Sequence, residues 1–372
     1  MDVAIIGAAG ACGRQLAAQV LQRQIVPTTD RLQLVGHGGG LSERELWGLR
    51  SDLEDAFGDW SPKVELAVDP ASVDADLVVM LAGRTVSLDP GEPVDRAELA
   101  RHNAELFHEY AVELGRRPSP PLVIVQSNPV ELGVRIFAEH LPRHHVLGAA
   151  AWSDTLRFRR ELAVELGVPR RDVAAFVLGE HGDHIVPIWS AIRARGVDAD
   201  VLRAVVERDR AGRDLAELAG EVARARGALM DRIRADDVAG AWDFVQSLPA
   251  DLRIAVKPYF TNFTSGRTTE AVTAHAVADL IEAFVDGVWR TLPAQVWVDG
   301  DWRGLRAAMA IPVVLMQTGW APAVDVEIAD DELAALQSAD EALGRMQDQH
   351  LAALREVGRA EVSDQSVPSS WV

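Results

Sequence analysis

The sequence has only one cysteine, Cys12, among 372 residues. A single cysteine excludes an intrachain disulfide and a metal site built from several thiolates. Long apolar runs are also missing, since no stretch approaches the roughly 18 apolar residues of a membrane-spanning helix. The first residues lack the basic segment that opens a secretory signal. We therefore expect a soluble, cytoplasmic protein.

Positive charge is scarce, because 37 Lys and Arg stand against 56 Asp and Glu, for a formal net charge of −19. Such an acidic surface repels phosphate backbones and anionic lipids, so we expect neither nucleic acid nor a membrane as partner. The substrate can still be an anion, since a local arginine cluster can override the mean field. The length and the 48% apolar content suit two packed globular domains.

The first 150 residues alternate between apolar strands and helical spacings, which predicts a Rossmann-type doubly wound parallel sheet of the α/β class. Their bare apolar runs indicate strands that are covered on both faces. We expect residues 1–150 to form a dinucleotide-binding domain. The expected strands are 1–6, 32–35, 77–81 and 122–126, and the expected helices are 14–22, 46–53 and 96–114.

From residue 151 to residue 360 the pattern predicts an α+β substrate and catalytic domain that ends in an amphipathic helix. Residues 361–372 carry little packing signal and are expected to form a frayed tail. The expected helices are 154–166, 201–233, 271–284 and 331–357, and the expected strands are 173–178, 295–298 and 311–315.

A glycine-rich turn follows the first expected strand and precedes the first helix. Its residues Gly7, Gly10, Ala11 and Gly13 leave bare or nearly bare backbone where a pyrophosphate approaches. The N-terminus of the helix would then offer free N–H groups to the anion. The same glycines could also serve an ordinary tight turn. Cys12, within the turn, is more simply a small packing residue than a nucleophile.

The second expected strand lacks the acidic residue that usually binds the ribose hydroxyls of NAD, because it continues into Gly36, His37 and three further glycines. A carboxylate there would repel a 2′-phosphate, so its absence slightly favours NADP over NAD. His37, Ser42 and Arg44 could contact that phosphate. The alternative is a flexible glycine loop with no phosphate partner.

Three segments carry polar residues that their surroundings do not explain: Ser127–Val130, Ser153–Arg159 and Leu178–Asp183. The first and third lie at the ends of apolar strands, where ligands meet an open α/β sheet. Each has a simpler alternative. An Asn-Pro pair is common in turns, an Asp and an Arg three residues apart often form a surface ion pair, and most single histidines are structural.

Taken together and in this order, these segments resemble the lactate/malate dehydrogenase family. The matching segments span most of the chain: Gly7–Gly13, Asp52–Ala56, Arg96–Asn103, Ser127–Val130, Ser153–Arg159, Leu178–Asp183, Val296–Gly300 and Ile311–Leu315.

The resemblance implies an NAD(P)-dependent oxidoreductase that transfers hydride reversibly between nicotinamide and a 2-keto acid. His181 would donate a proton to the ketone oxygen, and Asp154 would hold its other ring nitrogen. Arg157, on the same helix face as Asp154, would clamp the substrate carboxylate. The family also implies three further site residues: Asn128 for the substrate oxygen and the cofactor, Asn103 near the cofactor, and Thr269 as a pocket hydroxyl.

The family's mobile loop corresponds to residues 83–96, where Gly and Pro suit a lid that closes and expels water. Arg96 matches the arginine that polarises the carbonyl group. Malate dehydrogenases carry a second arginine just before the Pro-Gly of this loop, and lactate dehydrogenases carry glutamine. This chain has Leu88 and Asp89 there, in a slightly longer loop, and its nearest arginine is Arg84.

Two substrate classes remain open. If Arg84 reaches the pocket, or Arg267 beside Thr269 supplies the cation, the substrate is a dicarboxylate such as oxaloacetate, which we favour. If Leu88 or Asp89 faces the pocket, a distal carboxylate would meet no partner or a like charge. The substrate would then be a lactate-like or larger 2-keto acid.

Two rival classes of protein fit these residues less well. A non-catalytic dinucleotide-binding protein would need the glycine turn but not Asp154, His181, Arg157 and Arg96 together. A metal-dependent nicotinamide glycosidase is disfavoured, because no His–Cys metal pair can be assembled away from Cys12, and we expect no metal.

The family forms homodimers or homotetramers. In that resemblance the helical face formed by Leu46, Leu49 and Leu53 would serve as an interface. The alternative is that this face packs on the protein's own sheet.

Overall fold

The computed structural model describes residues 1–85, 96–265 and 268–364, and it describes no side chain of residues 96, 97 or 357–364. In this part of the chain an 11-stranded sheet has the order β3-β2-β1-β4-β5-β6-β9-β10-β7-β8, with β11 paired to β10. Its strands are β1 (Val3–Ile6), β2 (Arg31–Val35), β3 (Lys63–Ala67), β4 (Leu77–Met80), β5 (Leu122–Val125), β6 (Val146–Gly148), β7 (Val173–Gly179), β8 (Ile185–Ala194), β9 (Arg290–Trp297), β10 (Ala308–Met316) and β11 (Gly319–Pro322).

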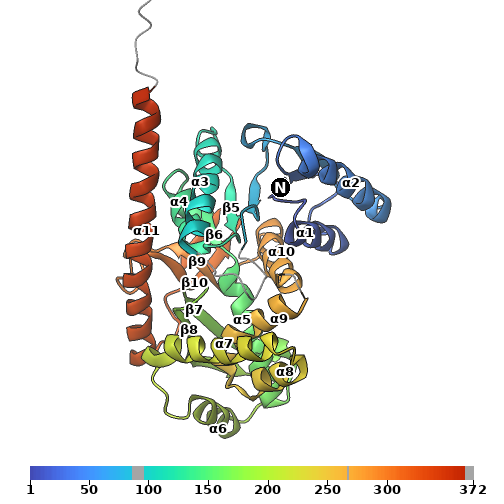
Figure 1. Ribbon diagram of the computed structural model, residues 1–372. Coiled ribbons are helices and arrows are strands. Elements are labelled where there is room, and N and C mark those ends of the chain that lie inside the picture. Colours follow the sequence, from blue (N-terminus) through green and yellow to red (C-terminus); the bar gives the residue numbers. More distant parts are fainter. Residues whose placement is uncertain (86–95, 266–267, 365–372) are drawn as a thin grey trace, which may run out of the picture.

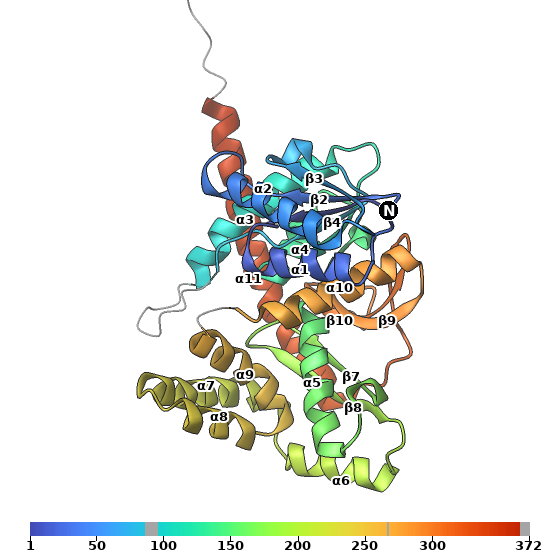
Figure 2. The same cartoon turned by 90° about the vertical axis from the view of Figure 1, so that its right-hand side faces the viewer.

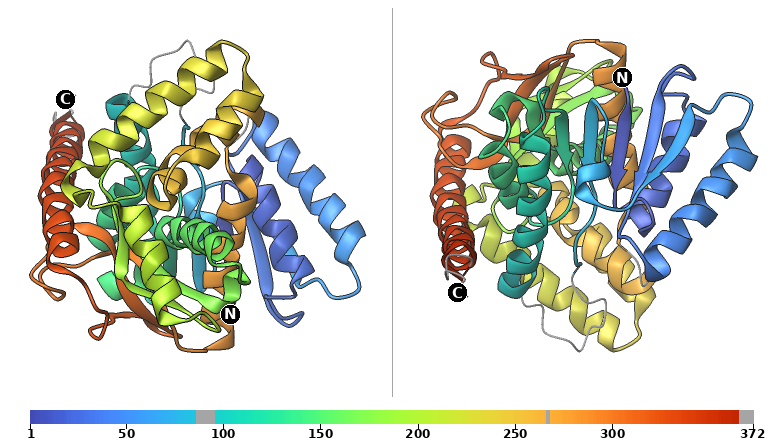
Figure 3. Two further views of the ribbon diagram at one scale, coloured as in Figure 1. Left: turned by 90° about the horizontal axis from the view of Figure 1, so that it is seen from below. Right: turned by 90° about the horizontal axis from the view of Figure 1, so that it is seen from above.

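The helices surround this sheet, with α2 and α11 at opposite sides of the molecule (Figure 3). They are α1 (Ala11–Gln22), α2 (Gly40–Phe57), α3 (Arg96–Gly115), α4 (Val130–Ala138), α5 (Ala150–Leu166), α6 (Ala199–Arg210), α7 (Leu218–Arg234), α8 (Val238–Ser247), α9 (Ala250–Ser265), α10 (Glu270–Asp286) and α11 (Asp330–Asp364).

Strands β1 to β6 are all parallel, as the sequence predicts, and their order β3-β2-β1-β4-β5-β6 is that of a Rossmann fold. Successive side chains of a strand point to opposite faces, so Ile5 and Ile6 enter two different cores. Ile5 joins the core under α1, α2 and α10, and Ile6 joins the core under α3 and α4. The strands are apolar throughout because helices cover both faces.

The second half continues the same sheet with antiparallel strands, and β6 meets β9 at the register pair Gly148–Gln295. Strands β7 and β8 form a hairpin that α5 covers. Phe158 of α5 and Trp189 of β8 make an edge-to-face contact with ring centroids 5.1 Å apart. Figure 2 shows α7 to α9 beside α5, and α6 at the end of this half that is farthest from the parallel strands.

Several elements differ from those expected from the sequence. The expected long helical region 201–233 is two helices, because Ala211 and Gly212 adopt positive φ values of 45° and 70° after α6. Strand β8 went unrecognised because Pro187 interrupts its apolar run, and α9 because Pro258 lies inside it. Strand β3 and helix α8 were also not expected. The terminal helix continues past residue 357 to Asp364, and residues 365–372 of the expected tail lie outside the described part.

The proposed use of the Leu46, Leu49 and Leu53 face as an interface is wrong for this fold. All three side chains are at most 5% exposed, because they pack into the core beneath α2. The exposed apolar side chains of α2 are Leu41 and Trp47 instead, at 70% and 57%.

Helix α11 runs along one side of the molecule (Figure 1). Near its start the buried carboxylate of Glu332 accepts the backbone N–H groups of Trp189 and Ser190, at 2.7 and 3.0 Å. About four turns further on, the Gln347 side-chain amide forms hydrogen bonds with both the N–H and the C=O of Ala308, at 3.0 and 2.7 Å. The helix therefore supplies hydrogen-bond partners to strands β8 and β10.

Candidate functional site: a dinucleotide turn beside a His–Asp–Arg cluster

The glycine turn after β1 is tightly folded against the neighbouring chain. Gly7 has φ = 85°, and a Cβ there would lie 2.7 Å from the backbone nitrogen of Ala82. A Cβ on Gly13 would lie 2.3 Å from the carbonyl oxygen of Gly7. Helix α1 begins at Ala11, after Gly10, so the N–H groups of its first turn lie at the turn. The residues fit a dinucleotide pyrophosphate, because both the bare backbone and the helix N-terminus are present.

The loop after β2 contains an acid that the sequence argument missed. A Cβ at Gly36 would lie 2.7 Å from Cδ1 of Leu46, so a larger residue there would have to displace that buried side chain. Glu43, in the first turn of α2, accepts the backbone N–H of Gly39 at 2.8 Å. Glu43 is not recognisable from the sequence because it lies eight residues after the end of β2. The first turn of α2 brings its carboxylate back to the loop. His37 and Arg44 of the expected phosphate site are exposed, and the His37 N–H donates to Ser42 Oγ at 3.2 Å.

Asn103 of α3 joins the segments that follow β4 and β5. Its Oδ1 accepts the N–H of Arg84 at 2.8 Å, and its Nδ2 donates to the carbonyl oxygens of Arg84 and Asn128, at 3.0 and 2.7 Å. The side chain is 1% exposed, so its three hydrogen bonds satisfy groups that water does not reach. Three residues expected at the site are thus brought together, although the Arg84 side chain itself is exposed.

The expected proton relay and carboxylate clamp form one connected cluster. Nδ1 of His181, just after β7, lies 2.6 Å from Oδ2 of Asp154. The other oxygen of Asp154 accepts from Nη1 of Arg157, one turn further along α5, at 2.6 Å. Nη2 of Arg157 donates to Oγ1 of Thr269, the residue before α10, at 3.0 Å. Four residues from three separate segments therefore form a continuous chain of contacts.

The charges in this cluster reinforce one another. Burial opposes ionisation of Asp154, but His181 and Arg157 outweigh it and lower the pKa of the carboxyl. Burial likewise opposes protonation of His181, but the Asp154 carboxylate outweighs it and raises the pKa of the imidazole. The cluster therefore favours an imidazolium whose Nδ1 is held and whose Nε2 can donate a proton.

A buried acid, Glu131, supports the cluster and was not expected from the sequence. It lies in the first turn of α4, accepts the backbone N–H of His181 at 2.7 Å and is 2% exposed. The amide of Gln295 donates to the same oxygen at 3.2 Å. Burial, with the Glu180 carboxylate nearby, raises the pKa of Glu131 to about 7. The only sequence signal is a charged residue directly after the Ser127–Val130 segment.

A cavity of about 480 Å³ adjoins this cluster, between α5, α9 and the start of α10. Arg157 and Thr269 line it, whereas Arg84, Asn128, Asp154 and His181 are not among its lining residues. Its volume lies within the range of small-molecule pockets. Of the other expected residues, the side chain of Arg96, at the start of α3, lies outside the described part, as do Leu88, Asp89 and Arg267.

No group of three or more His, Cys, Asp or Glu side chains in the described part of the chain is placed to hold a metal ion. None of the helices described is both long enough and apolar enough to cross a lipid bilayer.

The sheet order and the glycine turn define a Rossmann-type α/β protein, and comparisons with known proteins agree. The family model described as lactate/malate dehydrogenase, NAD binding domain, matches residues 1–148. A malate dehydrogenase of Chlorobium phaeobacteroides is 30% identical over 224 residues, which are 57% of this chain and 68% of that protein. The L-lactate dehydrogenase B chain of Sus scrofa is 26% identical over 351 residues, 93% of this chain and 91% of that one.

A solved structure shows the same fold: the malate dehydrogenase of Plasmodium falciparum superposes with a TM-score of 0.72 at 17% identity, covering 95% of this chain and 99% of that one. This chain belongs to the lactate/malate dehydrogenase family. The members of that family are NAD-dependent oxidoreductases that act on the CH–OH group of small 2-hydroxy acids.

Proposed function

We propose that this protein is a malate dehydrogenase-like enzyme that interconverts a 2-keto acid such as oxaloacetate and its 2-hydroxy acid. The observation that carries the proposal is the contact chain from His181 through Asp154 to Arg157, with Arg157 lining a cavity. A protein that only bound a dinucleotide would not need a buried imidazolium, its counter-ion and a guanidinium at a cavity wall. This argues against the non-catalytic alternative.

In the proposed mechanism, the bound nicotinamide supplies or accepts the hydride. His181 donates its Nε2 proton to the keto oxygen and recovers it in the reverse direction. Asp154 fixes the tautomer by holding Nδ1, and its charge stabilises the imidazolium. Arg157 binds the carboxylate next to the reacting carbon, where its planar guanidinium can make paired hydrogen bonds.

Further roles follow from the family resemblance and belong to the same proposal. Arg96 would polarise the keto group. Asn128 would bond the substrate oxygen and contact the cofactor, and Asn103 would hold the adjoining backbone. Thr269 would line the substrate pocket and steady Arg157, to which it is bonded in the structure.

The choice of cofactor depends on the loop after β2. The missing strand-end acid leaves room for NADP, which His37, Ser42 or Arg44 could contact. Glu43 weighs against this choice, because a carboxylate fixed at Gly39 would repel a 2′-phosphate and could accept from ribose hydroxyls. We therefore propose NAD as the cofactor.

The distal group of the substrate is the least constrained part of the proposal. We favour a dicarboxylate, with Arg84 or Arg267 as the first candidates for its second carboxylate. The alternative is a lactate-like or larger 2-keto acid, should Leu88 or Asp89 face the pocket. We further propose a cytoplasmic homodimer or homotetramer, with a dinucleotide-binding domain over 1–150 and a substrate domain over 151–360.

One experiment tests the proposed substrate and cofactor together. Purified protein is assayed with a panel of 2-keto acids against NADH and NADPH, and kcat/KM is measured for every pair. Oxaloacetate with NADH should exceed pyruvate at least tenfold. Preference for pyruvate or a branched keto acid would replace the dicarboxylate, and no turnover with any pair would favour the non-catalytic alternative.

A further inference from the structure

The cavity beside Arg157 is lined mainly by basic side chains, although the protein as a whole is acidic. The chain has 56 acidic residues against 37 basic ones. Among the described residues that line the cavity, four side chains are basic and two carry carboxylates. The basic lining residues are Arg157, Arg160, Arg170 and Lys257, and the acidic ones are Glu161 and Glu270. An anionic ligand would therefore be attracted here despite the acidic surface.

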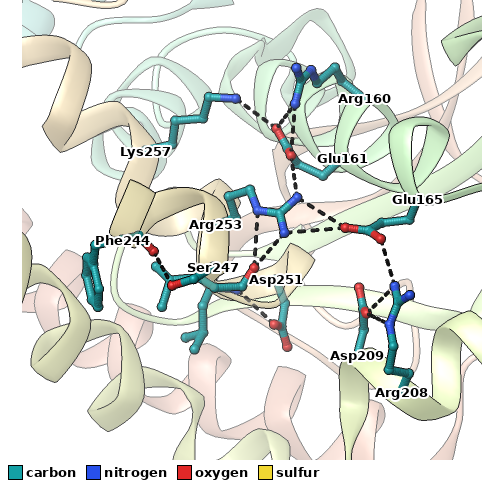
Figure 4. A network of polar contacts seen from close by, with 12 residues as sticks. Arg160, Glu161, Glu165, Arg208, Asp209, Phe244, Ser247, Asp251, Arg253 and Lys257 are labelled. Carbon is teal, nitrogen blue, oxygen red and sulfur yellow. Dashed lines mark hydrogen bonds and ion pairs between the residues drawn. The ribbon is translucent and has the colours of Figure 1, made fainter. Parts of the chain in front are cut away.

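Two of these cations are gathered by one buried carboxylate, as Figure 4 shows. Glu161, on α5, has a side chain that is 2% exposed. Arg160 Nη1 approaches both of its oxygens, at 2.9 and 3.0 Å, and Lys257 Nζ approaches Oε1 at 2.9 Å. Arg253 Nη1 donates to Oε2 at 2.8 Å from the opposite side. Glu161 thus has three cationic partners.

The cluster carries excess positive charge on its cavity side. Burial opposes the ionisation of Glu161, but the hydrogen bonds from Arg253 and Lys257 outweigh it and lower the pKa of the carboxyl. Arg253 also bonds Glu165, at 3.4 Å, on the side away from the cavity lining. If the charge of Glu165 balances that of Arg253, the two cations Arg160 and Lys257 have only the one negative charge of Glu161 between them.

The two cations remain accessible while their anchor does not. The side chains of Arg160 and Lys257 are 46% and 24% exposed, against 2% for Glu161. Each has donors to spare, since an ammonium has three N–H groups and a guanidinium five. The pair can therefore bind a second carboxylate without giving up Glu161.

We propose that Lys257 and Arg160 form the subsite for the distal carboxylate of a 2-keto dicarboxylate whose first carboxylate Arg157 binds. The inference rests on the proposed function and assigns its substrate specificity to α5 and α9 instead of to Arg84 or Arg267. Arg160 follows Arg157 by three residues on α5, so the Cβ atoms of the two arginines lie about 5–6 Å apart on the helix surface. The 480 Å³ cavity that both line leaves room for an extended four- to six-carbon diacid.

The test compares substrates that differ in the distal carboxylate. The ratio of kcat/KM for oxaloacetate to that for 2-oxobutyrate is measured in the wild type, Lys257→Met and Lys257→Arg. We expect Lys257→Met to lower this ratio at least tenfold, equivalent to about 1.4 kcal/mol. Lys257→Arg, which keeps the charge, should restore most of it. The same comparison is made with 2-oxoglutarate and 2-oxoadipate, to find the preferred chain length.

Arg208→Met is the matched control. Arg208 belongs to the same ionic network, through Glu165 at 2.9 Å, but it does not line the cavity. It should leave the substrate ratio unchanged. A ratio that falls equally in Arg208→Met and Lys257→Met would show a general effect of the network and overturn the subsite.

Calorimetry separates failure of the subsite from failure of the proposed function. Glutarate and butyrate are titrated into the NADH-loaded protein, so that no turnover is needed. Glutarate should bind at least tenfold more tightly than butyrate, and Lys257→Met should remove most of that difference. Turnover without a distal-carboxylate preference overturns the subsite alone. Equal binding of the two acids overturns it even if no keto acid is reduced.

Discussion

Nδ1 of His181 and Oδ2 of Asp154 lie 2.6 Å apart, across 27 positions of sequence. The contact fixes the orientation of the ring, because the remaining oxygen of Asp154 is held by Arg157 at 2.6 Å. The imidazole therefore does not have to be oriented when the substrate arrives, which is the advantage of a preorganised site.

Removing the imidazole should remove the chemistry and leave cofactor binding largely intact. In His181→Asn we expect kcat to fall by about 10² to 10⁴, the usual contribution of a positioned general acid. NADH affinity, measured by fluorescence titration, should change little, since the glycine turn is built from other segments. Turnover at the wild-type rate would contradict the proposed role of His181.

The pH profile should report the coupling of His181 to Asp154. The carboxylate raises the pKa of the imidazole above its usual value. Keto-acid reduction needs the protonated ring, so its kcat/KM should fall as pH rises through this raised pKa. In Asp154→Asn the fall should occur at lower pH, since the opposing effect of burial then dominates. An unchanged midpoint in that variant would show that Asp154 does not set the pKa.

Glu131 should make the protein less stable at alkaline pH. Its pKa is 4.5 in the reference state and about 7 when folded, so the fold favours the protonated form. A raised pKa contributes stability that is complete below the unfolded value and is lost as pH rises through the folded one. The full loss is roughly 3 kcal/mol, since each pKa unit of the shift corresponds to about 1.4 kcal/mol.

Urea denaturation at acidic and alkaline pH measures this effect. Glu131→Gln keeps an oxygen that can accept from the His181 N–H but removes the titration. The variant should therefore lose less stability than the wild type between pH 5 and pH 8, which are about two units below and one unit above the folded pKa. Parallel losses in the two proteins would contradict the raised pKa.

A methyl group at Gly13 should disrupt the dinucleotide turn. Its Cβ would lie 2.3 Å from Gly7 O, and backbone atoms cannot move aside cheaply. We expect Gly13→Ala to lose about 1–3 kcal/mol of stability and most of its NADH affinity. Gly48→Ala is the control, since a Cβ there meets nothing within 4 Å on the exposed face of α2. That variant should gain up to about 1 kcal/mol.

Glu43 should discriminate between the two cofactors. We expect Glu43→Gln to lower the ratio of kcat/KM for NADH over NADPH by about tenfold, because a like charge no longer faces the 2′-phosphate. The control is Glu45→Gln on the same helix, whose carboxylate lies near Arg14, at 3.6 Å. A ratio unaffected by Glu43→Gln would show that its carboxylate does not reach the ribose.

Local signals made much of the fold and part of the site predictable. Strands such as β4 and β5 are continuous apolar runs, and Gly7 and Gly13 lie where the chain turns between strand and helix. His181 and Asp154 were found through their motifs, although nothing local shows that they touch. Their contact depends on packing between α5 and the end of β7.

The residues that sequence reasoning missed act over long range. Glu131 is notable only because it is buried, and burial is decided by β6 and β9 around it. Lys257 belongs to a cavity formed when α9 packs on α5, and Pro258 hides that helix in the sequence. Glu43 returns to its loop because α2 turns it there. None of these placements can be read from spacing along the chain.

Helix α11 has a consequence for the order of events during synthesis. Its Glu332 and Gln347 complete the hydrogen bonding of strands that precede it by up to 143 positions. Until residue 347 has left the ribosome, β8 and β10 therefore lack some of these hydrogen-bond partners. Both halves depend on late segments, because α10 completes the core under α1 and α2, and Leu351 of α11 joins the core under α3 and α4.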